Sequence, residues 1–192
     1  MAAREHRTEP HLSRSPFGKI PAFEDGELTL FESRAISRYV LRKYGSGTRP
    51  DLLRESSLEE SAMVDVWTEV EAQQYHPAIS HIVRQCVIMP LIGGVRDQAV
   101  VDENVGKLGK VLDVYEARLS SSPYLAGDFF SLADLAHFAF TYCVMTGTEY
   151  ASLLESRPSI RAWWGRIMDR PAVMKVAALI DLALLKPLWS AK

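Results

Sequence analysis

The residues near the N-terminus that could do chemistry are suited to holding a carboxylate. Arg7 follows His6, and a planar guanidinium can bind a carboxylate through two parallel hydrogen bonds. Further along, Glu32-Ser33 directly precedes a helical pattern, and free backbone N–H groups at a helix start attract anions. Two alternatives need no ligand: Ser33 could simply cap its helix, and His6-Arg7 could be a solvated chain end.

Other groupings of reactive side chains do not form a recognisable site. His76 and His81 are five residues apart, so a helix would turn them to different faces, which is poor geometry for a shared metal. The paired glycines fit turns and form no phosphate-binding loop. Asp134 follows Ser131 at the spacing of a capping box, so we assign it to helix capping and not to catalysis. No metal is expected.

The composition is typical of a globular protein. The 192 residues are 47% hydrophobic and 24% charged, with a net charge of −2, which excludes a disordered chain. At about 150 residues per domain, this length corresponds to one domain and a fraction of another. No apolar run of about 18 residues predicts a membrane span, and no basic stripe predicts a nucleic-acid partner. Cys86 and Cys143 lie far apart in apolar stretches, so we expect free thiols in the cytoplasm.

The segment before residue 45 predicts a β-hairpin followed by one helix. Two apolar runs, Ile20–Phe23 and Leu28–Phe31, flank residues 24–27, whose Asp-Gly pair is a strong hairpin signal. Apolar residues at helical spacing then predict a helix over 33–44. Because an isolated hairpin is marginal in water, we interpret residues 1–44 as part of an α/β domain. Glycine and proline in the next residues predict a linker over 45–54.

Residues 55–192 predict an all-helical domain. Apolar spacing indicates a long helix over about 55–90, which Pro77 should bend or restart. Apolar residues from Val101 to Leu119 recur every three or four positions and predict an amphipathic helix. Residues 131–145 are apolar nearly all round, which predicts a buried central helix. Two more helices are expected at about 159–169 and 171–180.

An ordered set of motifs resembles the cytosolic glutathione S-transferases, and most closely the plant phi class. In the N-terminal region these motifs are His6-Arg7, Glu9-Pro10 with Leu12, Ser15-Pro-Phe-Gly-Lys-Ile-Pro-Ala-Phe23 and Leu30-Phe-Glu-Ser-Arg-Ala-Ile36. In the helical region, Tyr124-Leu-Ala-Gly-Asp128 and Ser131-Leu-Ala-Asp-Leu135 resemble the family's fold-stabilising motif. The resemblance runs from about residue 5 to residue 180, and the set is specific because its motifs occur in order.

The resemblance implies a truncated thioredoxin-like half-domain followed by the family's all-helical C-terminal bundle. The family's leading strand-helix-strand unit has no counterpart before His6, and in the phi class that unit supplies the serine that stabilises the glutathione thiolate. By position, no residue here inherits that catalytic role. The resemblance makes Pro21 the cis-proline, lets Ile20 present its backbone to glutathione, and places the γ-glutamyl carboxylate at Ser33. The implied glutathione-binding set is His6, Arg7, Lys19, Ile20, Pro21, Glu32 and Ser33.

The function implied by the resemblance is conjugation of glutathione, as co-substrate, to hydrophobic electrophiles by a homodimer. Phe17 lies in a segment that relatives use near the dimer interface. The alternative is a catalytically silent form that binds hydrophobic ligands or pairs with a full-length subunit. The candidate residues for contact with the hydrophobic substrate are Tyr75, Ile79, Ile82 and Tyr142. Core packing is the alternative interpretation for these four, because apolar stripes at helical spacing usually belong to a core.

Overall fold

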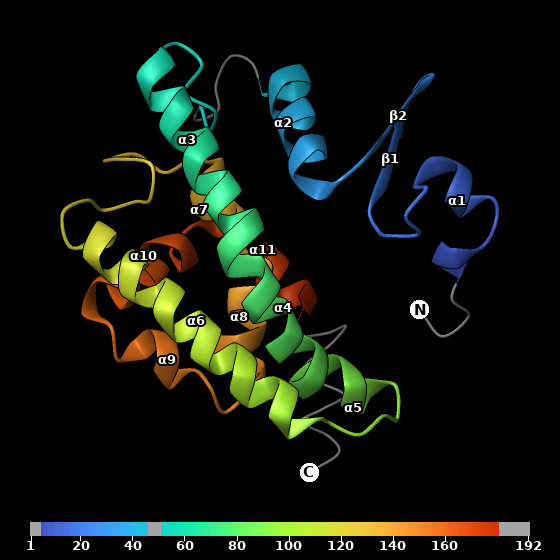
Figure 1. The fold of residues 1–192 in the computed structure, drawn as a ribbon. Helices are drawn as coiled ribbons and strands as arrows, with labels where there is room; N and C mark the ends of the chain where they lie inside the picture. Colours follow the sequence, from blue (N-terminus) through green and yellow to red (C-terminus); the bar gives the residue numbers. More distant parts are fainter. Residues whose placement is uncertain (1–4, 46–50, 181–192) are drawn as a thin grey trace. The chain divides into compact units, whose positions relative to one another are not determined.

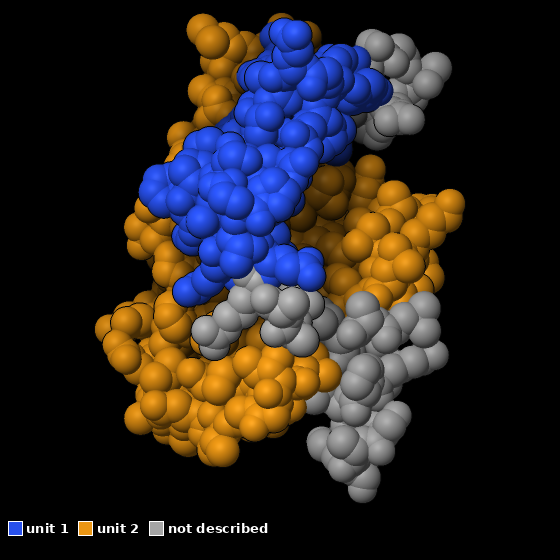
Figure 2. Space-filling view, turned by 90° about the vertical axis from the view of Figure 1, so that its right-hand side faces the viewer, with its two compact units in different colours: residues 1–55 blue, residues 56–192 orange. Residues whose placement is uncertain are grey.

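The computed structural model describes residues 5–45 and 51–180 and is mostly helical with one two-stranded sheet (Figure 1). The chain divides into two units, residues 1–55 and 56–192, which are coloured separately in Figure 2. The expected fold class is confirmed, with a hairpin and helix in the first unit and helices alone in the described part of the second. Among the described residues, no helix is both long and apolar enough to cross a membrane.

The first unit contains a short N-terminal helical segment, the hairpin and one longer helix. Its elements are a 3₁₀ turn at Glu5–Arg7, α1 at His11–Arg14, β1 at Ala22–Asp25, β2 at Leu28–Phe31 and α2 at Ser33–Tyr44. The bounds of α2 agree with the helix predicted from apolar spacing. The turn and α1 before the hairpin were not predicted, because four or fewer residues give too little periodicity to detect.

The strands of the hairpin pair in a register that the sequence prediction missed. Asp25 pairs with Leu28, so the turn contains only Gly26 and Glu27, and Gly26 has a φ of 64°. A two-residue turn of this kind favours glycine, which enters the left-handed region without a Cβ clash. The predicted four-residue loop therefore shortens to two residues, and β1 begins at Ala22 instead of Ile20.

The hairpin is joined to α2 through the carboxylate of Asp25. Its Oδ2 accepts hydrogen bonds from Lys43 Nζ at 2.5 Å and from the hydroxyls of Tyr39 and Tyr44, each at 2.8 Å. The Phe23 ring also meets the Tyr39 ring edge to face, with centroids 6.1 Å apart. The Lys43 ammonium, followed by the two tyrosine hydroxyls, lowers the pKa of Asp25 to about 2.

The second unit begins with a nearly continuous helical run that contains two π-helical turns. The run consists of α3 at Leu58–Val70, a π turn at Glu71–Tyr75, α4 at His76–Val83, a second π turn at Arg84–Ile88 and α5 at Met89–Leu91. Pro77 lies in the first turn of α4, just after the first π turn. Pro77 is thus found where α-helical winding resumes after a π turn, which is one of the two outcomes predicted for this proline.

The remaining helices of the second unit surround this run. They are α6 at Gln98–Leu119, α7 at Leu132–Ala136, α8 at Phe138–Gly147, α9 at Ser152–Glu155, α10 at Pro158–Met168 and α11 at Pro171–Ile180. Helix α4 packs on both α6 and α8, and α10 packs on α6 (Figure 1). The predicted seam of α6 is buried at Val101, Leu108, Leu112, Tyr115 and Leu119, whereas Val105 is half-buried.

The predicted helix over 131–145 is divided at His137 into α7 and α8. The backbone N–H of His137 donates to Asp134 only three residues back, while its ring Nδ1 donates to the Ala133 carbonyl at 2.7 Å. The imidazole thus takes the carbonyl that the backbone N–H of His137 itself would normally use in an α-helix. In the neutral ring Nε2 must then accept, and it lies 2.9 Å from the Tyr115 hydroxyl. The packing of α6 against this corner, which the local sequence does not show, explains the break.

Candidate functional site

The sheet register brings two parts of the predicted glutathione-binding set together in the first unit. Ala22 pairs with Phe31. Ile20 and Pro21, which precede β1, therefore lie at the same end of the hairpin as Glu32 and Ser33, which follow β2. The Ile20–Pro21 peptide bond is cis, as the resemblance implies. Four of the seven predicted residues therefore lie at one end of the hairpin.

Ile20 is exposed, and its backbone N–H and carbonyl groups make no backbone hydrogen bond in the described part of the chain. The exposed fraction of this residue is 57%. A backbone with free donor and acceptor groups next to a strand can pair with an extended peptide, in the manner of an added strand. The conformation thus fits the role that the resemblance implies for this residue.

The start of α2 does not show the simple capping that is the alternative interpretation of Ser33. Glu32 occupies the cap position with a φ of 71°, its side chain makes no capping hydrogen bond, and Ser33 is the first helical residue. The first N–H groups of a helix lack partners within the helix and attract negative charge. Because its cap carries no capping side chain, this helix start can receive a carboxylate from a ligand.

His6 and Arg7 lie against the loop that leads to Ile20. A Cβ atom built on Gly18 would lie 3.0 Å from the carbonyl oxygen of His6 and 3.6 Å from Cγ of Arg7. Gly18 is buried and has a φ of 58°, so glycine permits both this close approach and the turn. The next carbonyl, that of Lys19, accepts a hydrogen bond from His11 Nε2 at 2.9 Å. The predicted basic residues are therefore held near the hairpin end and do not form a free chain end.

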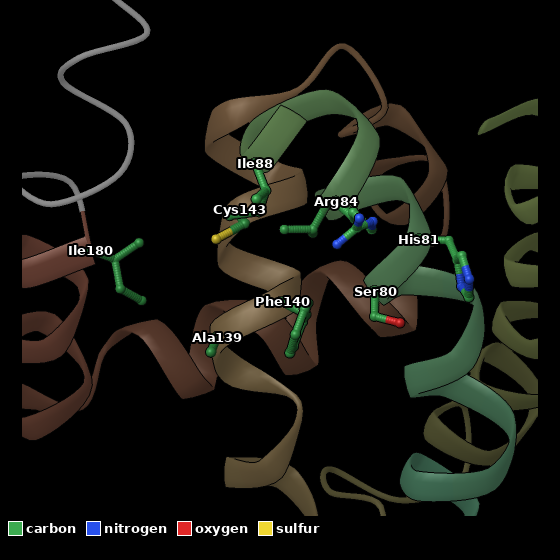
Figure 3. A pocket seen from close by; sticks show the side chains of 9 residues that line it. Ser80, His81, Arg84, Ile88, Ala139, Phe140, Cys143 and Ile180 are labelled. Carbon is green, nitrogen blue, oxygen red and sulfur yellow. The ribbon is translucent and has the colours of Figure 1, made fainter. Parts of the chain in front are cut away.

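The second unit contains an apolar cavity of about 410 Å³ (Figure 3). It lies among α4, the second π turn, α8 and the end of α11. Its wall is mostly hydrocarbon, with polar groups only from Ser80, His81 and Arg84. The apolar lining comes from Val83, Ile88, Ala139, Phe140, Cys143 and Ile180.

None of the four residues predicted to contact a hydrophobic substrate lines this cavity. Tyr75, Ile79 and Ile82 are fully buried and Tyr142 is only 7% exposed, so all four belong to the core of the second unit. Tyr75 also contacts Thr141 Oγ1 through its hydroxyl at 2.8 Å, and burial raises the pKa of Tyr75 above its usual value. In this structure the four residues therefore pack in the core, as the alternative interpretation states.

The residues that line the cavity do not follow from a regular helical pattern in the sequence, for two reasons. Arg84 and Ile88 begin and end a π turn, which shifts the faces of the helix relative to a regular 3.6-residue pattern. Phe140 and Cys143 lie on a helix that is apolar on nearly every side, so periodicity alone does not separate a wall from a core. The available signal is Arg84, because no other Lys, Arg, Asp or Glu occurs between residues 72 and 95.

Asp134 has the structural role predicted from its spacing. Its side chain is fully buried, and Oδ2 accepts from the backbone N–H of Ser131 at 2.9 Å, completing a capping box. Oδ1 accepts from the indole N–H of Trp163 at 2.8 Å and from the N–H of Leu125 at 3.0 Å. Burial raises the pKa of Asp134, and these hydrogen bonds oppose the rise.

Comparison with known proteins places both units in one family. The family model for the glutathione S-transferase N-terminal domain matches residues 1–42, and that for the C-terminal domain matches residues 75–171. Glutathione S-transferase 1 from Zea mays is 56% identical over 180 residues, covering 94% of this chain and 82% of the relative.

Two solved structures show the same similarity in three dimensions. Glutathione transferase F7 from Populus trichocarpa has a TM-score of 0.86 at 55% identity, covering 92% of this chain and 82% of that one. Glutathione S-transferase I from mais, in complex with an atrazine glutathione conjugate, has a TM-score of 0.84 at 55% identity, covering 95% and 84%.

Proposed function

Because this chain belongs to the plant phi class of the glutathione S-transferase family of enzymes, we propose that it conjugates glutathione to hydrophobic electrophiles. The first unit would bind the tripeptide, and the cavity of the second unit would hold the apolar co-substrate. In the reaction, the thiol of glutathione loses its proton, sulfur forms a bond to an electrophilic carbon, and the leaving group departs with the electron pair of its bond. We assign no side chain among the described residues to stabilisation of the thiolate.

The end of the hairpin is the observation that supports glutathione binding. The open backbone of Ile20 suits the cysteinyl unit, and the α2 start at Ser33 suits the γ-glutamyl carboxylate. Arg7 suits the glycyl carboxylate because its guanidinium matches that group with paired hydrogen bonds. Glutathione has negative groups at both ends, so the arrangement matches its charge as well as its extended shape.

Calorimetric titration with glutathione and with γ-glutamylcysteine tests these assignments. The variant Arg7→Gln should weaken glutathione binding by about 5-fold or more, as expected for loss of a charged hydrogen bond. It should leave γ-glutamylcysteine binding unchanged, because that dipeptide lacks the glycyl carboxylate. The matched control is Arg161→Gln, at an exposed position of α10 in the second unit. Equal weakening of both peptides would contradict the assignment of Arg7.

Hydrophobic-ligand binding without catalysis is a second candidate function. It is favoured by the cavity, whose lining comes entirely from the second unit and does not depend on glutathione. Turnover of 1-chloro-2,4-dinitrobenzene with glutathione, followed by absorbance, separates the two functions. Measurable kcat supports the transferase, whereas glutathione binding with no turnover supports the silent binder.

The proposed assembly is a homodimer, and the proposed compartment is the cytoplasm. Phe17 is 71% exposed and packs against Phe31, which is itself 37% exposed, with ring centroids 6.2 Å apart. Exposed aromatic residues of this kind are enriched at protein interfaces. Neither Cys86 nor Cys143 forms a disulfide, which suits a reducing compartment. Sedimentation of Phe17→Ser should show a shift toward monomer, and an unchanged mass would exclude Phe17 from the interface.

A further inference from the structure

Arg84 places a positive charge at the wall of the apolar cavity. It begins the second π turn, between α4 and Ile88, and its side chain is exposed (Figure 3). In the described part of the chain, no hydrogen bond or ion pair joins its guanidinium to another residue. Apolar side chains cannot form hydrogen bonds or ion pairs with a guanidinium, so this group can bind an anionic ligand.

Two acidic residues of neighbouring elements already form ion pairs. Glu103 on α6 accepts from Lys107 Nζ at 2.7 Å, and Glu149 accepts from Arg96 at 2.6 Å. The cavity lining itself contains no carboxylate. The charge at the cavity wall is therefore positive and has no internal counter-ion among these groups.

We propose that this cavity prefers apolar molecules that have one negatively charged substituent, and that Arg84 determines this preference. This inference rests on the proposed function, because it takes the cavity to be the site of the hydrophobic co-substrate. The aromatic or aliphatic body of the ligand would lie against Phe140 and Ile88. Its carboxylate or sulfonate would accept hydrogen bonds from the Arg84 guanidinium, a fork that matches such groups.

A pair of fluorescent probes of similar shape tests the preference without catalysis. 8-Anilinonaphthalene-1-sulfonate is anionic, and N-phenyl-1-naphthylamine is its neutral counterpart. Titration of the full chain should show that Arg84→Gln weakens the anionic probe by about 3- to 10-fold, between the effects of exposed and buried charged contacts. The neutral probe should change by less than 2-fold. Arg84→Lys should restore part of the affinity for the anionic probe.

Two further variants locate the binding and control for surface charge. Ala139→Trp adds bulk at an exposed position of the cavity wall and should weaken both probes. Arg161→Gln removes an arginine on α10 that does not line the cavity and should change neither.

The outcomes separate this inference from the function on which it rests. If both probes bind and respond to Ala139→Trp but Arg84→Gln affects them equally, the charge preference is wrong while the cavity remains a binding site. If neither probe binds, or Ala139→Trp changes nothing, both the preference and the assignment of the cavity are wrong. Selective loss of the anionic probe in Arg84→Gln supports the inference.

Discussion

Replacing Asp134 with alanine should destabilise the second unit strongly. The fully buried carboxylate accepts hydrogen bonds from the backbone N–H groups of Leu125 and Ser131 and from the indole N–H of Trp163. Without it, three buried N–H donors have no acceptor. Each such donor costs about 1–3 kcal/mol, so we expect the free energy of unfolding to fall by roughly 3–9 kcal/mol.

The variant Asp134→Asn gives an intermediate case. Its remaining oxygen can still accept from Trp163 and Leu125, but its amide group would face the N–H of Ser131, donor against donor. One unsatisfied pair corresponds to a loss of about 2 kcal/mol. The order wild type, Asp134→Asn, Asp134→Ala therefore follows from the number of acceptors that remain.

Urea unfolding, followed by tryptophan fluorescence and by far-ultraviolet circular dichroism, measures these differences. The matched control is Asp169→Ala at an exposed position that ends α10, which should change stability by less than about 0.5 kcal/mol. A loss below about 1 kcal/mol for Asp134→Ala would refute the reasoning, because relaxation or water would then be satisfying the donors.

Three other predictions follow from contacts within single units. Trp67→Phe should destabilise less than Trp163→Phe in urea unfolding, because the buried indole N–H of Trp67 has no partner among the described residues whereas that of Trp163 donates to a carboxylate. Glu116→Ala should cost about 1 kcal/mol of unfolding free energy, because this side chain accepts the first N–H groups of α10; no change would mean that water replaces it. The lowered pKa of Asp25, about 2, means that its stabilisation is complete above the unfolded pKa of about 3.9 and is lost as pH falls toward 2. A carbon-detected NMR titration of Asp25 should show this, and a midpoint near 4 would contradict it.

Much of the fold follows from local patterns in the sequence. The apolar spacing over 33–44 predicted α2 with its observed ends, and the Ser131-to-Asp134 spacing predicted the capping box. These features depend on residues a few positions apart, so the local sequence contains the needed information.

Other features of the fold do not follow from apolar spacing and capping motifs alone. The break at His137 involves Tyr115 on another helix, and the hairpin register shifted because its turn has two residues and not four. The cap position of α2 belongs to Glu32, whose φ of 71° is unusual for a non-glycine residue. The motif resemblance predicted the glutathione-binding residues at the hairpin end. The residues of the cavity wall could not be predicted from a regular helical pattern, because part of the wall is a π turn.

The two π turns are positions where the long helical run can gain or lose one residue during evolution. A π turn holds one residue more than an α-helical turn, so Glu71–Tyr75 and Arg84–Ile88 each behave like a single-codon insertion in a regular helix. Deleting one residue from the second turn would restore regular α-helical winding and leave the residues that follow on the helix faces that they occupy now. A one-residue length change at Arg84–Ile88 would thus alter the part of the cavity wall that this turn supplies while leaving α4 and α5 on either side in place.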